Sequence, residues 1–122
     1  MCGIVGYVGC NQAAPILLAG LKRLEYRGYD SAGIALMNGE SVRVLKKPGK
    51  IHVLEDAMEV SSEMATCGIA HTRWATHGAP NEPNAHPHTS MDGDIAIVHN
   101  GIIENADIIR QQLASEGYTF RS

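Results

Sequence analysis

The spacing of apolar and polar positions predicts most of the helices and strands of this chain. Residues 3–8 are apolar and rich in β-branched side chains, which is typical of a buried strand. A helix is expected to begin at Asn11 or Gln12, with Pro15 in its first turn, where a missing N–H group is tolerated. The apolar face that would pack this helix on a sheet consists of Leu17, Leu21 and Leu24.

A break at residues 26–30 separates this helix from the strongest hairpin signal in the chain. Strands are expected over 32–37 and 41–45, because an Asn-Gly turn at Asn38-Gly39 lies between them. Apolar residues then recur at helical spacing and predict a second, shorter helix over 51–60. The remaining expected elements are a polar loop at 61–63, a strand over 67–73, a Pro-rich loop over 74–88, a strand over 95–99, a helix from Asn105 to Gly117 and a strand beginning at 118–120.

This order of elements is neither a strict strand-helix alternation nor an all-strand pattern. Helices that cover layers of antiparallel sheet, an α+β architecture, are the simplest arrangement that buries every apolar face. The sequence has no internal repeat, low-complexity segment or linker-like composition, so no domain boundary is expected within residues 1–122.

Composition and charge exclude several classes of function. The 122 residues carry a net charge of −3, which removes the electrostatic basis for binding nucleic acid. The longest apolar runs, such as 95–98, are far below the ~18 residues needed to cross a bilayer, so no membrane association is expected. Three cysteines, Cys2, Cys10 and Cys67, form neither a CxxC pair nor an even set, which favours a reducing, cytoplasmic location.

The first residues suggest a nucleophile. Removal of Met1 would leave Cys2 at the N-terminus, where its thiolate can attack an acyl carbon while its own α-amino group accepts and returns the proton. The competing interpretation is that Cys2 is a small apolar residue at the start of a strand.

Polar residues at other strand ends and turns could converge on the same cleft. Asn100 and Gly101 could offer an amide and a backbone N–H to a developing oxyanion, although an Asn-Gly pair is more often only a turn. Arg73 could clamp a substrate carboxylate or form a surface ion pair. Trp74 could be core packing or a gate, and Thr76 and His77 are ambiguous alone.

The histidines do not indicate a metal site. His86 and His88 flank Pro87 without a Cys or Glu partner at zinc-like spacing, and the sequence has no H-E-x-x-H motif. His71, His77 and His99 also invite a metal interpretation, but histidines in a Pro-rich ordered loop more often satisfy backbone groups. No glycine-rich phosphate loop precedes a helix either, so no cofactor is expected.

Together these stretches resemble the class II, N-terminal-nucleophile glutamine amidotransferases. The short Cys-Gly-Ile-Val start is common to the whole superfamily. More specific segments point to the branch that forms glucosamine 6-phosphate from fructose 6-phosphate. The matching segments are residues 2–6, 24–33, 68–78, 84–88 and 99–105.

The resemblance implies a fold, a reaction and a set of roles. The fold would be the four-layer α/β/β/α sandwich of N-terminal-nucleophile hydrolases, and the reaction would be hydrolysis of the L-glutamine side-chain amide through a glutamyl thioester. The implied roles are Cys2 as nucleophile, Asn100 and Gly101 as oxyanion hole, Arg73 with Thr76 and His77 as the glutamine site, Trp74 as gate for ammonia, and Arg27 and Gly28 as support for the nucleophile.

The family pattern continues beyond this sequence. In the family, an aspartate in a Glu-Thr-Asp segment binds the substrate α-amino group, and that segment would follow Ser122. Residues 1–122 are therefore expected to be a partial glutaminase domain, without its C-terminal part and the sugar-isomerase domains that bind fructose 6-phosphate. We also expect low stability in isolation, from exposed sheet edges and apolar helix faces.

Two other interpretations remain open at this point. The chain could belong to another class II amidotransferase, such as a phosphoribosyl one, or it could be an inactive module, since a retained Met1 would block the α-amino group. The full-length enzyme is expected to be a homo-oligomer.

Overall fold

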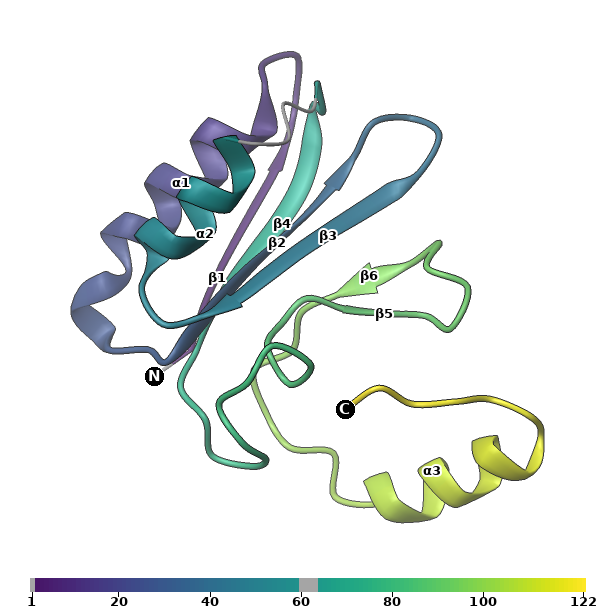
Figure 1. Ribbon diagram of the computed structural model, residues 1–122. Helices are drawn as coiled ribbons and strands as arrows, with labels where there is room; N and C mark the ends of the chain where they lie inside the picture. The colour runs from purple at the N-terminus through teal and green to yellow at the C-terminus, as the bar shows by residue number, and fades with distance from the viewer. Residues whose placement is uncertain (1, 60–63) are drawn as a thin grey trace.

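The computed structural model describes residues 2–59 and 64–122, and its elements follow the predicted order closely (Figure 1). The main sheet contains β1 (Gly3–Val8), β2 (Ser31–Met37), β3 (Val42–Pro48) and β4 (Cys67–Arg73), and its helices are α1 (Ala13–Arg23) and α2 (Ile51–Glu59). A short 3-10 turn spans Glu25–Arg27, and the C-terminal part holds β5 (His88–Thr89), β6 (Ala96–Ile97) and α3 (Ala106–Ser115).

The order of the strands brings distant segments of the chain to one end of the sheet. The four strands are arranged β1-β4-β2-β3, and every neighbouring pair is antiparallel. Gly3 pairs with Thr72, and Ser31 pairs with Arg73. The start of β1, the end of β4 and the start of β2 therefore meet, although they are far apart in the sequence.

One face of this sheet forms the core with α1 and α2. Leu17, Leu21, Ile34, Ile51 and Leu54 are almost completely buried there. Burial of each such side chain contributes about 1.5–3 kcal/mol relative to exposure. Two of the three residues of the predicted apolar face of α1, Leu17 and Leu21, are buried here, whereas Leu24 caps the helix and is only partly buried.

The opposite face is covered by the loop before β5. His71 and Gly33 face each other across β4 and β2, and Ala85 and Pro87 are buried against this side. The approach is so close that a Cβ atom on Gly33 would overlap the carbonyl oxygen of His86. Glycine at this position therefore allows the loop to lie directly on the sheet.

The C-terminal part is built differently. The β5–β6 ribbon has two residues per strand, and α3 has no buried residue. In Figure 1 the ribbon lies between the main sheet and α3, which gives the helix, sheet, sheet, helix order expected of the α+β sandwich. Among the residues that the structure describes, no helix combines the length and hydropathy that a membrane span requires.

Two predicted strands need correction, and a few predicted positions lie outside the residues that the structure describes. The strand expected over 95–99 is reduced to β6, because its only ladder partner is the two-residue β5, which was predicted as loop. The strand expected from 118 is wrong: these residues make no ladder and run beside a cleft. Position 60 of the second helix, the loop at 61–63 and Met1 lie outside the described residues.

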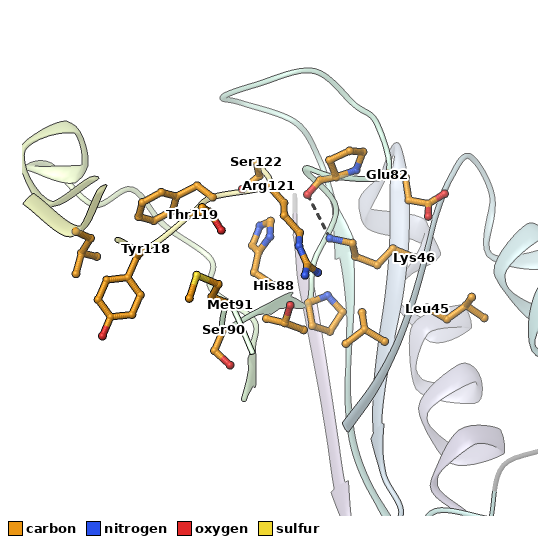
Figure 2. Close-up of a pocket in the computed structure, with 16 residues that line it drawn as sticks. Leu45, Lys46, Glu82, His88, Ser90, Met91, Tyr118, Thr119, Arg121 and Ser122 are labelled. Carbon is orange, nitrogen blue, oxygen red and sulfur yellow. Dashed lines mark hydrogen bonds between the residues drawn. The ribbon is translucent and has the colours of Figure 1, made fainter. Parts of the chain in front are cut away.

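The cleft beside the C-terminal segment has a volume of about 790 Å³ (Figure 2). It lies between β3, β5 and residues 118–122, and Lys46 crosses toward the loop to donate a hydrogen bond to the Pro83 carbonyl at 3.2 Å. Burial lowers the pKa of Lys46 from its usual 10.5. None of its lining residues is a predicted site residue, so the candidate chemistry lies elsewhere.

Candidate active site

Cys2 lies at the end of the sheet where the three strand ends meet. Its Sγ accepts a hydrogen bond from the Trp74 backbone N–H at 3.3 Å and lies 3.7 Å from the Trp74 carbonyl oxygen. The following residue, Gly3, donates its N–H to the Thr72 hydroxyl at 3.1 Å. The hydrogen bond from the Trp74 backbone positions the sulfur. Because the thiol is also partly exposed, a ligand can reach it.

The Trp74 backbone is in turn held by Asp30. The Asp30 N–H donates to the Arg73 carbonyl at 2.7 Å, and its Oδ2 accepts the Ala75 N–H at 2.6 Å. Asp30 thus fixes the turn on both sides of Trp74 and, through it, the position of the Cys2 sulfur. The second carboxylate oxygen, Oδ1, is buried and has no hydrogen-bond partner within the described part of the chain.

Asn100 reaches the nucleophile from the C-terminal part of the chain. Its Nδ2 donates to the Cys2 carbonyl at 3.3 Å, and its Oδ1 lies 2.6 Å from Nε2 of His71. The next residue, Gly101, has a φ of +153°, a conformation that side-chain-bearing residues rarely adopt. The structure therefore brings Asn100 to Cys2 across 98 residues of sequence.

His71 is the buried partner of this arrangement. Its side chain is 0% exposed, and burial lowers its pKa from the ordinary 6.5; the hydrogen bond with Asn100 opposes this shift, and the charge of Arg73 adds to it. The imidazole is therefore neutral near pH 7.

The Arg73 guanidinium is bonded to the turn that follows β4. Its NH1 donates to the Ala79 carbonyl at 2.9 Å, and its NH2 donates to the carbonyl of His77. The side chain is 6% exposed. Arg73 thus organises the turn that carries Thr76 and His77, whose side chains contact each other at 3.2 Å. A clamp on a substrate carboxylate remains a prediction.

Trp74 also lies beside Gly28. A Cβ atom on Gly28, which has a φ of +79°, would lie 3.6 Å from the indole ring, so the ring covers this glycine. Arg27 ends the 3-10 turn that leads to it. The indole is 53% exposed, and an exposed ring next to the nucleophile is compatible with the predicted gate, which stays a prediction.

Three histidines form a stack rather than a metal site. The rings of His71 and His86 are stacked with centroids 4.2 Å apart, and the His88 ring is tilted against His86 at 4.4 Å. Stacking joins ring faces and does not direct nitrogen lone pairs to one point. Within the described ranges, no group of three His, Cys, Asp or Glu residues could hold a metal ion.

These contacts define a site suited to acyl transfer. A thiol with a positioned sulfur lies beside an amide donor, and neither a second basic side chain nor a metal is needed if the cysteine's own amine serves as base. Sequence reasoning predicted that Cys2 and Asn100 would share one site, and the structure brings the two residues into contact, while their catalytic roles stay predictions. It missed the supporting roles of Asp30 and His71, whose only signal was that each belongs to a specific matching segment.

Two solved structures share this fold. The chain matches the "allosteric regulatory enzyme of purine biosynthesis" with a TM-score of 0.81, and the glutamine phosphoribosylpyrophosphate amidotransferase of B. subtilis with 0.78. Both are 31% identical and aligned over 98% of this chain and 26% of theirs. The fold is that of the glutamine amidotransferases, and the chain belongs to this family.

Within the family, the relatives of higher identity share one name. The chain is 60% identical to the glutamine–fructose-6-phosphate aminotransferase (isomerising) of Chlorobaculum tepidum and 56% identical to that of Thermus thermophilus, in both cases over its whole length. It spans about a fifth of the length of these curated relatives (20% of each). No family model matches the chain.

Proposed function

We propose that this chain forms the nucleophile-bearing part of a glutaminase domain that hydrolyses the side-chain amide of L-glutamine. The observation that supports it is the contact between Asn100 and Cys2. Cys2 Sγ attacks the amide carbon, and the carbonyl oxygen becomes an oxyanion beside the Asn100 Nδ2 group and the Gly101 N–H.

The rest of the reaction follows from this adduct. The α-amino group of Cys2, free once Met1 is removed, transfers the thiol proton to the leaving nitrogen, and the C–N bond breaks to release ammonia and a glutamyl thioester. Water then cleaves the C–S bond, which gives glutamate and regenerates the thiol. Arg73 holds the substrate α-carboxylate, with Thr76 and His77 alongside, and Arg27 and Gly28 support the nucleophile.

The identity to the aminotransferases supports a destination for the ammonia. We propose that the full-length protein passes it, past Trp74, to fructose 6-phosphate and forms glucosamine 6-phosphate. Three unpaired cysteines favour a cytoplasmic protein. Homo-oligomeric assembly and independence of any cofactor belong to the same proposal.

The test is labelling by a glutamine-like diazo-ketone, followed by mass spectrometry and ammonia assay. We expect loss of Met1, label on Cys2, and a glutaminase rate that Cys2→Ala reduces by about 10⁴-fold or more, as for removal of other catalytic nucleophiles. Cys67→Ala is the matched control and should keep both label and rate. An intact Met1 with no label would instead support an inert module.

A second candidate, transfer of ammonia to a phosphoribosyl acceptor, is favoured only by the fold shared with the purine enzyme at 31% identity. Offering each acceptor with glutamine distinguishes the two, because only one sugar phosphate should be aminated.

A further inference from the structure

We infer that His71 is a positioning residue that fixes which end of the Asn100 amide faces the nucleophile. This inference rests on the proposed glutaminase function, in which Asn100 donates to the oxyanion. His71 is separated from Asn100 by 29 residues and lies on β4, in the well-packed part of the molecule.

The argument begins with the symmetry of an amide group. The Asn100 side chain can present either oxygen or nitrogen to Cys2, and the two orientations have nearly the same shape. Only the orientation with Nδ2 toward Cys2 offers a donor: one hydrogen reaches the Cys2 carbonyl, and the other remains for an oxyanion. The opposite orientation would place an acceptor beside a developing negative charge.

His71 selects the productive orientation. Its Nε2 lies 2.6 Å from Asn100 Oδ1, and because an amide oxygen only accepts, Nε2 must carry the hydrogen. The other ring nitrogen, Nδ1, is buried without a hydrogen-bond partner among the described residues, so a hydrogen placed there would be a buried donor with no acceptor, and the neutral ring carries its hydrogen on Nε2 instead. A neutral ring with its hydrogen on Nε2 satisfies these contacts. If the Asn100 amide were turned over, its NH₂ group would face the Nε2–H group, and two donors would oppose each other.

The surroundings of His71 hold this ring in place. The stack with His86 lies on one ring face. Nδ1 of His86 also accepts the backbone N–H of His99 at 3.4 Å, so the same stack holds the residue before Asn100. Asn100 itself is exposed and follows a two-residue strand. Its orientation therefore depends on the side chains that β4 and the loop before β5 supply.

A double-mutant cycle in the full-length protein tests this role. His71→Phe keeps a stacking ring but removes the donor, and we expect a fall in glutaminase kcat of about 100-fold, comparable to loss of an oxyanion donor, with KM within about 2-fold. In the Asn100→Ala background, the same substitution should cost less than about 3-fold. His88→Phe, at the far end of the stack, is the matched control and should change kcat by less than about 3-fold.

The possible outcomes separate this inference from the proposed function. If the losses of His71→Phe and Asn100→Ala multiply, or if KM rises while kcat is retained, His71 is only a packing residue. If the wild-type protein releases no ammonia, the glutaminase proposal fails. A second readout then still decides the geometry: nitrogen NMR should find hydrogen on Nε2 of His71 at neutral pH, and hydrogen on Nδ1 would overturn the inference.

Discussion

The two parts of this molecule differ in how firmly they are packed. Helix α1 buries Ala13, Leu17, Leu18 and Leu21 against a sheet whose strands are six or seven residues long. Helix α3, of nearly the same length, buries no residue, and the ribbon beside it has two-residue strands. The first part therefore has a core of its own, whereas α3 and the β5–β6 ribbon bury little apolar surface.

The candidate active site lies across this difference. Cys2, Asp30 and Arg73 belong to the well-packed part, and Asn100 and Gly101 belong to the other. Low local stability is common where a site must open or adapt to a ligand. Here the segment that carries Asn100 and Gly101 is connected to the part that carries Cys2 through the contacts of Asn100 and through the histidine stack. We therefore expect these few contacts to determine whether the site is assembled.

The largest expected difference in unfolding free energy is between truncating a buried residue of α1 and truncating an exposed apolar residue of α3. Leu17→Ala should lower the free energy of unfolding by about 2–5 kcal/mol, because Leu17 is completely buried and its truncation leaves a cavity. Ile108→Ala, on α3 at 68% exposure, should cost less than about 0.5 kcal/mol. Denaturant titration of both variants measures the contrast, and equal losses would show that the C-terminal part has a core of its own.

The next effect concerns the contact that joins the loop to the sheet. Gly33→Ala should destabilise by about 1–3 kcal/mol, since its Cβ would overlap the His86 carbonyl and displace the loop. Gly6→Ala is the matched control on β1, because a Cβ there meets nothing within 4 Å. Thermal unfolding compares them. If Gly33→Ala is as stable as Gly6→Ala, the loop does not lie on β2 as described.

A smaller effect should appear in the pH dependence of stability. Burial lowers the pKa of His86 to about 3 and that of His88 to about 4, from an unfolded value of 6.5. Well above pH 6.5 both rings are neutral in the folded and in the unfolded state, so this contribution is complete. As pH falls from 6.5 toward 4, the unfolded chain binds protons that the folded chain excludes, and stability decreases by at most about 1 kcal/mol per pH unit for each partly exposed ring.

Substitution identifies the source of this pH dependence. His88→Phe should flatten the slope of unfolding free energy between pH 6.5 and 4, whereas His52→Gln, at an exposed position on α2, should leave it unchanged. Urea titrations at several pH values provide the measurement. An unchanged slope in His88→Phe would mean that folding does not lower the pKa of the His88 ring.

The smallest effect is expected for a surface contact between the two regions. Lys47 on β3 and Glu82 in the loop form an ion pair at 3.5 Å, with side chains that are 33% and 55% exposed. Such pairs contribute about 0–1 kcal/mol. A double-mutant cycle with Lys47→Met and Glu82→Gln should give a coupling in this range that decreases with salt. A larger, salt-independent value would show a tighter junction than the exposure indicates.

Much of the fold could be predicted from local pattern. The strand over 67–73, the Asn38-Gly39 hairpin and the apolar faces of α1 and α2 depend on periodicity and turn chemistry, which neighbouring residues determine alone. Predictions failed where the length of a strand depends on how far its partner strand extends. The run at 95–99 has strand-like composition, yet it pairs over two residues only, because β5 is that short.

The same division holds for the site. The sequence by itself determined that Cys2 could be a nucleophile after loss of Met1, and that an Asn-Gly pair could stabilise an oxyanion, since both follow from side-chain chemistry. Only the tertiary structure decided that the Trp74 backbone contacts Cys2, that Arg73 bonds to the turn at 77–79, and that His71 lies within hydrogen-bond distance of Asn100. These contacts join residues far apart in sequence, and they arise from strand order and register, which no local pattern contains.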